Sequence, residues 1–412
     1  MGNFKTILRA FIALIILGST ASAQEGLSIY GFFQASALHL KNEYTFKASK
    51  FGIPTATDSK ITESYTSYQL QQANLLLRNE FNDQFSGFLN LEFTNNYSSS
   101  KGWGSFGVKE AFMRYQYSEQ LVAKIGMFVP KFNNLYEISE KTPLLPYAFR
   151  PLVYETITES IIDQNDFLPS KAFAQIEGFI PIDEVKIDYA AYFGNVESKY
   201  ITSETVPAQL MAVNGMNQKN DLAAFGGRIG ARYNTLKFGV SLAKDMKNMS
   251  NIEQYFAAAS NINPFVAKIN FGNVPRTKLG VDLNVSKFGF TFSGEMILTT
   301  LDLSDAHKDT LKSLQSGMFT KGIINEDTDK LFYYTTLKYN FTDEVFVYGM
   351  YNFFQDKMIY NTQEGIKSMS GGIGYSPLPN VTFKAQYFHN QSDNNLLEFT
   401  HYGLMIATSV AF

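Results

Sequence analysis

The sequence of 412 residues contains no cysteine, a single tryptophan and only four histidines. Without cysteine the chain has no disulfide, and no thiolate for a metal site or for nucleophilic catalysis. Its formal net charge of −3 and the lack of a basic stripe argue against nucleic-acid binding. Beyond the N-terminal region no apolar run approaches the roughly 20 residues that a membrane-spanning helix needs.

The N-terminal region has the pattern of a secretory signal peptide. Lys5 and Arg9 precede a short apolar run that ends at Leu17, and small residues up to Ala23 offer a cleavage site. The alternative is a short amphipathic anchor, because the run is too short to cross a bilayer. We expect residues 1–23 to be removed on export and residues 24–412 to form one folded domain.

A two-residue period dominates the expected mature chain. Near the C-terminus apolar and aromatic residues recur at every second position: Tyr402, Leu404, Ile406, Val410 and Phe412. Such segments are about 9 to 13 residues long, which suits a tilted strand of a membrane barrel, whereas the 3.6-residue period of a helix fails in them. Only helices and closed barrels satisfy every backbone group in lipid, so any membrane span here must be a β-barrel.

Sixteen alternating segments are found, an even number as in single-chain bacterial barrels. They lie near residues 27–40, 66–81, 84–96, 107–117, 121–131, 170–181, 184–197, 222–233, 236–246, 275–286, 287–301, 330–340, 343–356, 367–376, 380–391 and 398–412. The predicted fold class is all-β, a single antiparallel transmembrane barrel in the bacterial outer membrane.

Connection lengths and aromatic positions support this arrangement. Short turns, such as those at Asn82-Asp83 and Ser286-Lys287, alternate with longer loops, as the periplasmic turns and extracellular loops of barrels do. Six of the eight strands that run toward the short turns end in an outward aromatic residue, which predicts a girdle at that membrane face: Phe81, Tyr117, Tyr233, Tyr339, Tyr375 and Phe412. The alternative, a soluble β-sandwich, would bury both aromatic faces and lack this asymmetry.

The predicted inner face is polar and carries charges of both signs. Basic residues assigned to it are Arg78, Arg114, Lys124, Lys186, Arg228, Arg232, Lys237, Lys278, Lys338 and Lys384, and acidic ones are Glu80, Glu92, Glu110, Glu177, Asp188, Asp282 and Glu295. The basic excess predicts a weak preference for anions in a water-filled channel. The alternative is that these charges pair across strands and fill space.

One long connection, residues 132–170, is too apolar and proline-rich for a surface loop. We expect this third extracellular loop to fold into the lumen, where its apolar residues can pack and its prolines stiffen it. Candidate pore-constriction residues are Arg150, Glu155, Tyr147, Tyr154 and Lys141. Arg150 and Glu155 would set a transverse field across the opening; alternatively they form a structural ion pair that anchors the loop.

Two other kinds of site are considered. The acidic run 325–329 could hold calcium in an extracellular loop, although a solvated loop tip is the simpler interpretation. No histidine has a recognisable serine partner, and the glycine-rich stretches at 226–230 and 371–374 are not followed by helices. We therefore expect neither an enzyme nor a cofactor.

Short segments of the chain are similar to the phosphate-selective porin O/P-like family. They are the first strand, Ser28-Ile29-Tyr30-Gly31-Phe32-Phe33-Gln34-Ala35-Ser36-Ala37, and the segments 110–115 and 124–132. The resemblance implies a sixteen-stranded, usually trimeric channel for anions or small organic solutes. The infolded loop has only Lys131, Lys141 and Arg150, fewer basic residues than the family's ladder, so phosphate specificity does not follow.

Taken with the residues, the resemblance predicts an outer-membrane porin for passive diffusion of small hydrophilic solutes. Its partners would be outer-membrane lipid, the solutes and two further copies of the chain. The competing interpretations are a structural or adhesive barrel without transport, and an outer-membrane enzyme.

Overall fold

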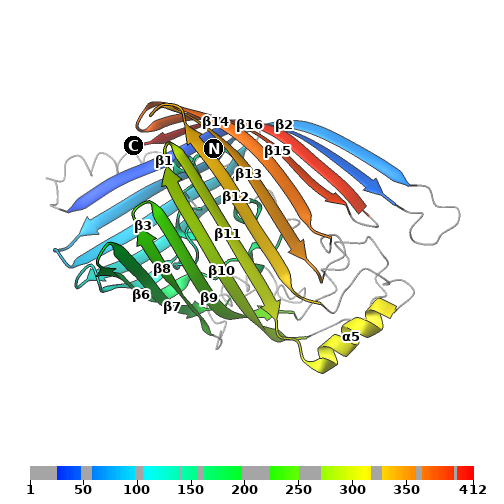
Figure 1. The fold of residues 1–412 in the computed structure, drawn as a ribbon, viewed down its shortest axis with the longest axis horizontal. Coiled ribbons are helices and arrows are strands. Elements are labelled where there is room, and N and C mark those ends of the chain that lie inside the picture. Colours follow the sequence, from blue (N-terminus) through cyan, green and yellow to red (C-terminus); the bar gives the residue numbers. More distant parts are fainter. Residues whose placement is uncertain are drawn as a thin grey trace, which may run out of the picture.

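The structure, a computed structural model, describes residues 26–47, 58–97, 105–139, 141–155, 162–196, 223–249, 271–316, 327–358, 364–393 and 397–412. The signal peptide expected over residues 1–23 lies outside these ranges. Figure 1 shows long tilted strands that follow one another around a single barrel.

All sixteen predicted strands are present, each antiparallel to its two neighbours. They are β1 (Leu27–Phe46), β2 (Ser59–Glu80), β3 (Phe85–Tyr97), β4 (Ser105–Gln116), β5 (Val122–Phe128), β6 (Ala172–Ile182), β7 (Val185–Asn195), β8 (Ala223–Tyr233), β9 (Leu236–Asn248), β10 (Asn273–Lys287), β11 (Phe290–Leu301), β12 (Lys330–Asn340), β13 (Val345–Asp356), β14 (Ile366–Leu378), β15 (Val381–Asp393) and β16 (Leu397–Ala411). Because β1 pairs with both β2 and β16, the barrel is closed and leaves no free sheet edge at its seam.

The two-residue period divides the barrel into an apolar outer face and an inner face. On β8 and β9 the outward residues Phe225, Ile229, Phe238, Val240 and Leu242 are all exposed, and buried residues alternate with them. An outer surface of this kind is stable in lipid. The predicted aromatic girdle is present at the short-turn end of the barrel. Tyr339 packs on Phe290 and Phe341. The other five members are exposed: Phe81, Tyr117, Tyr233, Tyr375 and Phe412.

Several strand boundaries differ from the sequence-based expectation: β1 runs on to Phe46 and β2 begins at Ser59, so this hairpin is longer than predicted. The turn between β10 and β11 falls at Phe288-Gly289 rather than at Ser286-Lys287, because Phe288 and Gly289 both adopt positive φ, 54° and 79°, as a tight hairpin turn requires. Strand β5 ends at Phe128 rather than near residue 131. From there the chain leaves the wall, and the backbone N–H of Val129 donates to Glu110 Oε1 at 3.3 Å.

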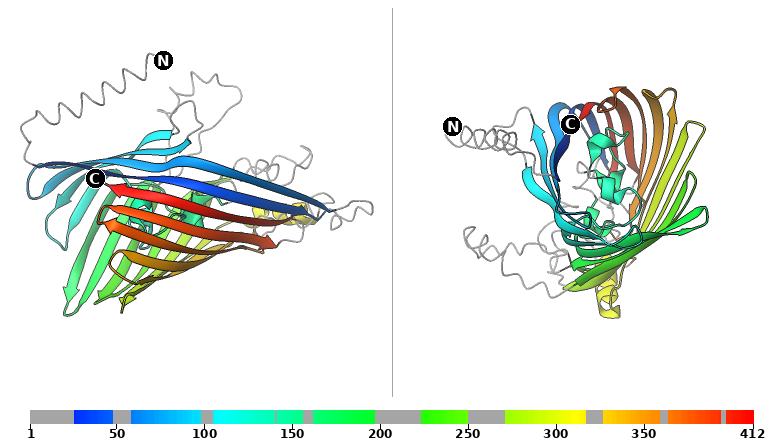
Figure 2. Two further views of the ribbon diagram at one scale, coloured as in Figure 1. Left: turned by 90° about the horizontal axis from the view of Figure 1, so that it is seen from above. Right: turned by 90° about the vertical axis from the view of Figure 1, so that its left-hand side faces the viewer.

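The expected infolded segment is described over residues 129–139, 141–155 and 162–171. Figure 2 shows its short helical turns inside the barrel in the end-on view, with the wall strands around them. Its elements are α2 (Tyr136–Ser139), η2 (Thr142–Leu144), η3 (Leu152–Tyr154) and η5 (Gln164–Asp166). Helix α5 (Asp305–Ser316) lies at the long-loop end between β11 and β12. Among the described residues, no helix has both the length and the apolar character to span a membrane.

Candidate functional site: the barrel lumen

The inner wall has an apolar half that the infolded segment covers. Inward residues of β1, β12, β13, β15 and β16 join residues of the segment in one buried apolar cluster; the wall residues include Leu38, Phe332, Tyr348, Phe354, Phe388 and Met405. Within the segment, Phe149 stacks on Phe388 with ring centroids 4.4 Å apart, and Tyr147 meets the Tyr348 ring edge-on at 5.4 Å. This half of the lumen is therefore packed like a protein core rather than open to water.

Polar side chains of the wall bind the backbone of the segment between these apolar contacts. Gln386 Oε1 accepts from the N–H groups of Ala148 at 3.0 Å and Phe149 at 2.6 Å. The buried Lys384 ammonium donates to the carbonyls of Thr142 and Pro143, both at 3.2 Å, and to Gln34 Oε1 at 3.1 Å. These contacts supply hydrogen-bond partners for backbone groups that the apolar packing removes from water.

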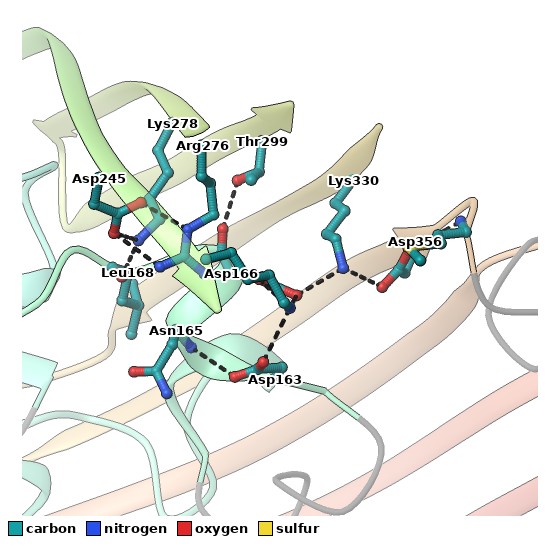
Figure 3. Close-up of polar contacts among 12 residues, drawn as sticks. Asp163, Asn165, Asp166, Leu168, Asp245, Arg276, Lys278, Thr299, Lys330 and Asp356 are labelled. Atoms are coloured by element: carbon teal, nitrogen blue, oxygen red, sulfur yellow. Dashed lines mark hydrogen bonds and ion pairs between the residues drawn. The ribbon is translucent and has the colours of Figure 1, made fainter. Parts of the chain in front are cut away.

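A second anchor is an ion-pair network centred on Asp166 (Figure 3). The Asp166 carboxylate binds three cations from three strands: Lys247 Nζ at 2.5 Å, Arg276 Nη1 at 2.8 Å and Lys330 Nζ at 2.6 Å. Its backbone carbonyl accepts from Thr299 Oγ1 at 2.7 Å. One acidic residue of the segment thus ties β9, β10, β11 and β12 to the infolded chain.

Neighbouring carboxylates balance the remaining charge of the network. Asp245 accepts from Arg276 Nε at 2.7 Å and from Lys278 Nζ at 3.0 Å, Asp356 pairs with Lys330, and Asp163 pairs with Lys247 at 3.2 Å. Asp166 lies in the segment, outside the strands. Burial would raise the pKa of its carboxyl, but Lys247, Lys330 and Arg276 outweigh burial and hold that pKa well below its usual value.

The residues predicted to form the constriction lie within the infolded segment, mostly buried in its packing. Arg150 and Glu155 contact each other: Glu155 Oε2 lies 3.5 Å from Arg150 Nε and accepts from the Arg150 N–H at 3.0 Å. Arg150 Nη1 also donates to Ser139 O at 2.8 Å. These contacts match the alternative of a structural pair that anchors the loop, since adjacent charges give little field across an opening.

The other three constriction candidates occupy different environments. Tyr147 is buried, with its hydroxyl 3.4 Å from Thr336 Oγ1, and Tyr154 is buried and donates to Glu295 Oε2 at 2.7 Å. Lys141 is half-buried. Of the five candidates, only Lys141 keeps substantial contact with water.

Replacing Arg150 with alanine distinguishes the two interpretations of this residue. We expect an unchanged reversal potential in asymmetric salt but a loss of about 1–3 kcal/mol in stability, because Glu155 would stay buried without its cation. Thermal unfolding and bilayer recordings measure the two effects. Lys141→Ala is the comparison: it should alter selectivity with little change in stability. A shift toward cation selectivity in Arg150→Ala would restore the field hypothesis.

The second half of the inner wall, formed by β2 to β9, is polar and carries the predicted pore-lining residues. On β2 to β5, Arg114 and Glu110 are half-buried, Arg78 pairs with Glu80 at 2.8 Å, and Glu92 pairs with Lys109 at 3.0 Å. Lys124 lies 3.2 Å from Glu177 on β6 and 3.9 Å from Glu137 of the infolded segment. The structure thus brings charges of both signs together between this wall and the segment.

Two predicted pore-lining arginines, Arg228 and Arg232, lie on β8 in the same part of the wall. Buried Arg228 binds Asp188 and, at 2.8 Å, Asp282, whereas the exposed Arg232 binds Asp188 at 3.0 Å. Glycine at position 239 leaves room for the Arg228 guanidinium, since a Cβ there would lie 2.1 Å from its Nη2 atom. Arg228 is therefore a paired wall residue, and Arg232 faces water.

Several residues of the lumen were missed by the sequence-based reasoning. The members of the Asp166 network were not predicted: Asp163, Asp166, Asp245, Lys247, Arg276, Lys330 and Asp356. The available signal was the two-residue alternation, since Asp245 and Lys247 occupy inward positions of β9, and Lys247 lies one residue beyond the predicted strand end. Glu137 and Lys109 were likewise missed as partners of wall charges.

The candidate calcium run is only partly described, because residues 325 and 326 lie outside the described ranges. Asp327 pairs with Lys357 at 2.9 Å, and Asp329 Oδ1 lies 3.2 Å from Thr300 Oγ1. Among the described residues no group of three or more metal-ligating side chains gathers.

Comparison with known proteins shows similarity in structure. No protein-family model and no curated protein sequence matches the chain. OmpF of Salmonella typhi, solved in complex with daunomycin, matches with a TM-score of 0.54 and 10% identity over 94% of this chain and 97% of its own. The anion-selective porin of Comamonas acidovorans matches with a TM-score of 0.51 and 10% identity over 94% and 99%. OmpT of Vibrio cholerae matches with a TM-score of 0.50 and 8% identity over 94% and 99%. The chain therefore has the closed sixteen-stranded fold of outer-membrane porins.

Proposed function

We propose that the chain is an outer-membrane porin that lets small hydrophilic solutes diffuse through a narrowed lumen. The observation that carries this proposal is the division of the inner wall: the part that the infolded segment covers is buried, with apolar packing and paired charges, whereas the β2 to β6 wall keeps half-exposed charges. A barrel that served only as a structural element would have no reason to keep such charges unburied. The fold shared with porins supports the same function.

The path for solutes would run between the β2 to β6 wall and the exposed face of the infolded segment. On that face Lys131, Glu137 and Lys141 are half-buried and Ile138 is exposed, while most of the remaining segment is buried. Beside this path, Lys131 Nζ of the segment lies 3.2 Å from Glu177 Oε2 of β6. Solutes would therefore pass close to paired charges, which suits polar and ionic compounds.

A weak anion preference is part of the proposal. Of the predicted basic positions, Arg228, Lys278 and Lys384 are buried, and the others keep contact with water: Arg78, Arg114, Lys124, Lys186, Arg232, Lys237 and Lys338. Most predicted acidic positions are buried, and only Glu80 and Glu110 are not. Basic residues exceed acidic residues more strongly among the water-facing positions than among all predicted inward positions. The lumen should therefore attract anions more strongly than the full set of inward charges would predict.

Replacing Arg114 with glutamine tests the proposed path and its charge. Arg114 faces inward and has no ion-pair partner among the residues that the structure describes. Its loss should lower the anion-to-cation permeability ratio by about twofold, since it is a single charge at short range. Planar-bilayer recordings in asymmetric potassium chloride give this ratio from the reversal potential.

The matched control is Lys312→Gln, because Lys312 is an exposed cation on α5, away from the barrel wall. It should leave the ratio unchanged. If the wild-type protein gave no stepwise channels, the porin proposal would fail and a structural or adhesive barrel would be favoured. Strong cation selectivity would instead contradict the proposed charge preference alone.

Export to the outer membrane, trimer formation and the lack of catalysis are also proposals. The apolar outer face supports a location in the membrane. Crosslinking of the protein in isolated outer membranes tests the trimer, which would give a ladder of bands that ends at three copies. A ladder ending at the monomer or dimer would contradict the trimer.

A further inference from the structure

Two rows of inward residues cross β2, β3, β4 and β5 near the short-turn end of the lumen. The strand register places Arg78, Phe88, Phe112 and Gly126 beside one another. One step nearer the short turns, it places Glu80, Ser86, Arg114 and Lys124 beside one another. An aromatic row thus lies directly above a row with two adjacent cations.

The aromatic row is a pair of phenylalanines that keep contact with water. Phe88 and Phe112 are both half-buried, with ring centroids 5.1 Å apart. Gly126 is the register partner of Phe112 on β5, and Phe128 of the same strand meets the Phe112 ring edge-on with centroids 5.4 Å apart, so one face of the phenylalanine pair is supported from the wall. Phenylalanine facing a water-filled lumen gains nothing from that water, so this surface is suited to an apolar group of a passing solute.

The cation row offers one paired and one unpaired charge. Lys124 Nζ lies 5.6 Å from the centroid of the Phe112 ring and is shared with Glu177 at 3.2 Å and Glu137 at 3.9 Å. Arg114 is half-buried and has no ion pair among the described residues. Its planar guanidinium can bind a carboxylate through two parallel hydrogen bonds.

Spacing joins the two rows into one site. Residues two apart on a strand, such as Phe112 and Arg114, lie on the same face and about 7 Å apart. This separation matches a solute with a ring and a carboxylate at opposite ends. A neutral sugar would leave Arg114 unused, an aromatic cation would be repelled by it, and an inorganic anion would gain nothing from the rings.

We propose that the Phe88, Phe112 and Arg114 surface on β3 and β4 binds small monocarboxylates that carry an aromatic ring. This inference rests on the proposed porin function for its biological meaning, but binding itself does not require conduction. The ring packs on Phe88 and Phe112, and the carboxylate accepts from Arg114. The site would favour such solutes over acetate and over inorganic anions in the channel.

Equilibrium dialysis of radiolabelled benzoate against the folded protein in detergent micelles tests the site directly. Protein-free micelles correct for partition, and acetate is the ligand without a ring. We expect benzoate to bind at least about tenfold more tightly than acetate, because only benzoate has a ring that can pack on the two phenylalanines. Equal affinity for benzoate and acetate would overturn the proposal.

Three variants separate the site from general effects on the barrel. Phe88→Leu should weaken benzoate binding about three- to tenfold and leave acetate binding unchanged. Arg114→Gln should weaken both ligands, and Arg114→Lys should restore part of that loss. Phe85→Leu is the matched control, because Phe85 lies on the same strand and packs on Tyr115 on the opposite face.

The outcomes also distinguish this proposal from that of the porin. Benzoate binding that Phe88→Leu weakens, in a protein without channel steps, would support the site and refute the porin. Channel steps together with benzoate binding that Phe88→Leu and Phe85→Leu leave equally strong would support the porin and refute the site.

Discussion

Replacing Asp166 with asparagine is expected to cost about 3–5 kcal/mol of stability, because it leaves three buried cations without their shared carboxylate. Lys247, Arg276 and Lys330 all lie within 2.8 Å of that carboxylate and come from three different strands. Their mutual repulsion should then push residues 162–171 off the wall. The midpoint of thermal unfolding, followed by circular dichroism, measures the loss.

The same variant should also change the proposed channel. With residues 162–171 no longer held against β9 to β12, single-channel conductance should rise and become noisier, since the segment would occupy varying positions in the lumen. Low pH should not mimic the variant until strongly acidic conditions are reached. The pKa of Asp166 is lowered by folding, so its contribution is present above its unfolded pKa and is lost only as pH falls through the lower folded value.

Asp309→Asn is the control for this variant, because Asp309 is an exposed aspartate on α5 whose side chain lies 3.9 Å from Lys312. An exposed pair contributes little, so its loss should cost less than about 0.5 kcal/mol. Asp166→Glu keeps the charge and should restore part of the stability. If Asp166→Asn were as stable as the wild type, the network would not be what holds the segment.

Replacing Leu152 with alanine is the second change with a large expected effect. Leu152 is 1% exposed, within the apolar cluster inside the barrel. Truncation there removes buried apolar surface and leaves a cavity, which costs about 2–5 kcal/mol. Denaturant unfolding of the protein in micelles, followed by tyrosine fluorescence, measures the change in free energy.

Leu144→Ala provides the matched control within the same segment. Leu144 is 57% exposed, so the same truncation should cost less than about 0.5 kcal/mol. A difference between the two variants shows that the segment belongs to the barrel's folding unit. Equal small effects for both would mean that the segment packs loosely against the wall and contributes little to its stability.

The strands are the part of the fold that the sequence predicts best. All sixteen were predicted, because alternation over nine or more residues requires one apolar face and one inner face whatever the neighbouring strand is. The strand ends are predicted less well, as at β5 and at Phe288, where a local backbone conformation decides the boundary. The pairing of side chains in the lumen is predicted least well.

The sequence by itself determined the main features of the barrel: the number of strands, the face on which each strand residue lies, the side with short turns and the infolding of one long apolar loop. Alternation and turn length act locally, so they can be read along the chain. Only the tertiary structure decided that Asp166 meets three strands, that Arg150 pairs with Glu155 within its own segment, and that Phe88 and Phe112 lie above Arg114. Those contacts depend on strand register and on the path of the infolded segment, which bring together residues far apart in the chain.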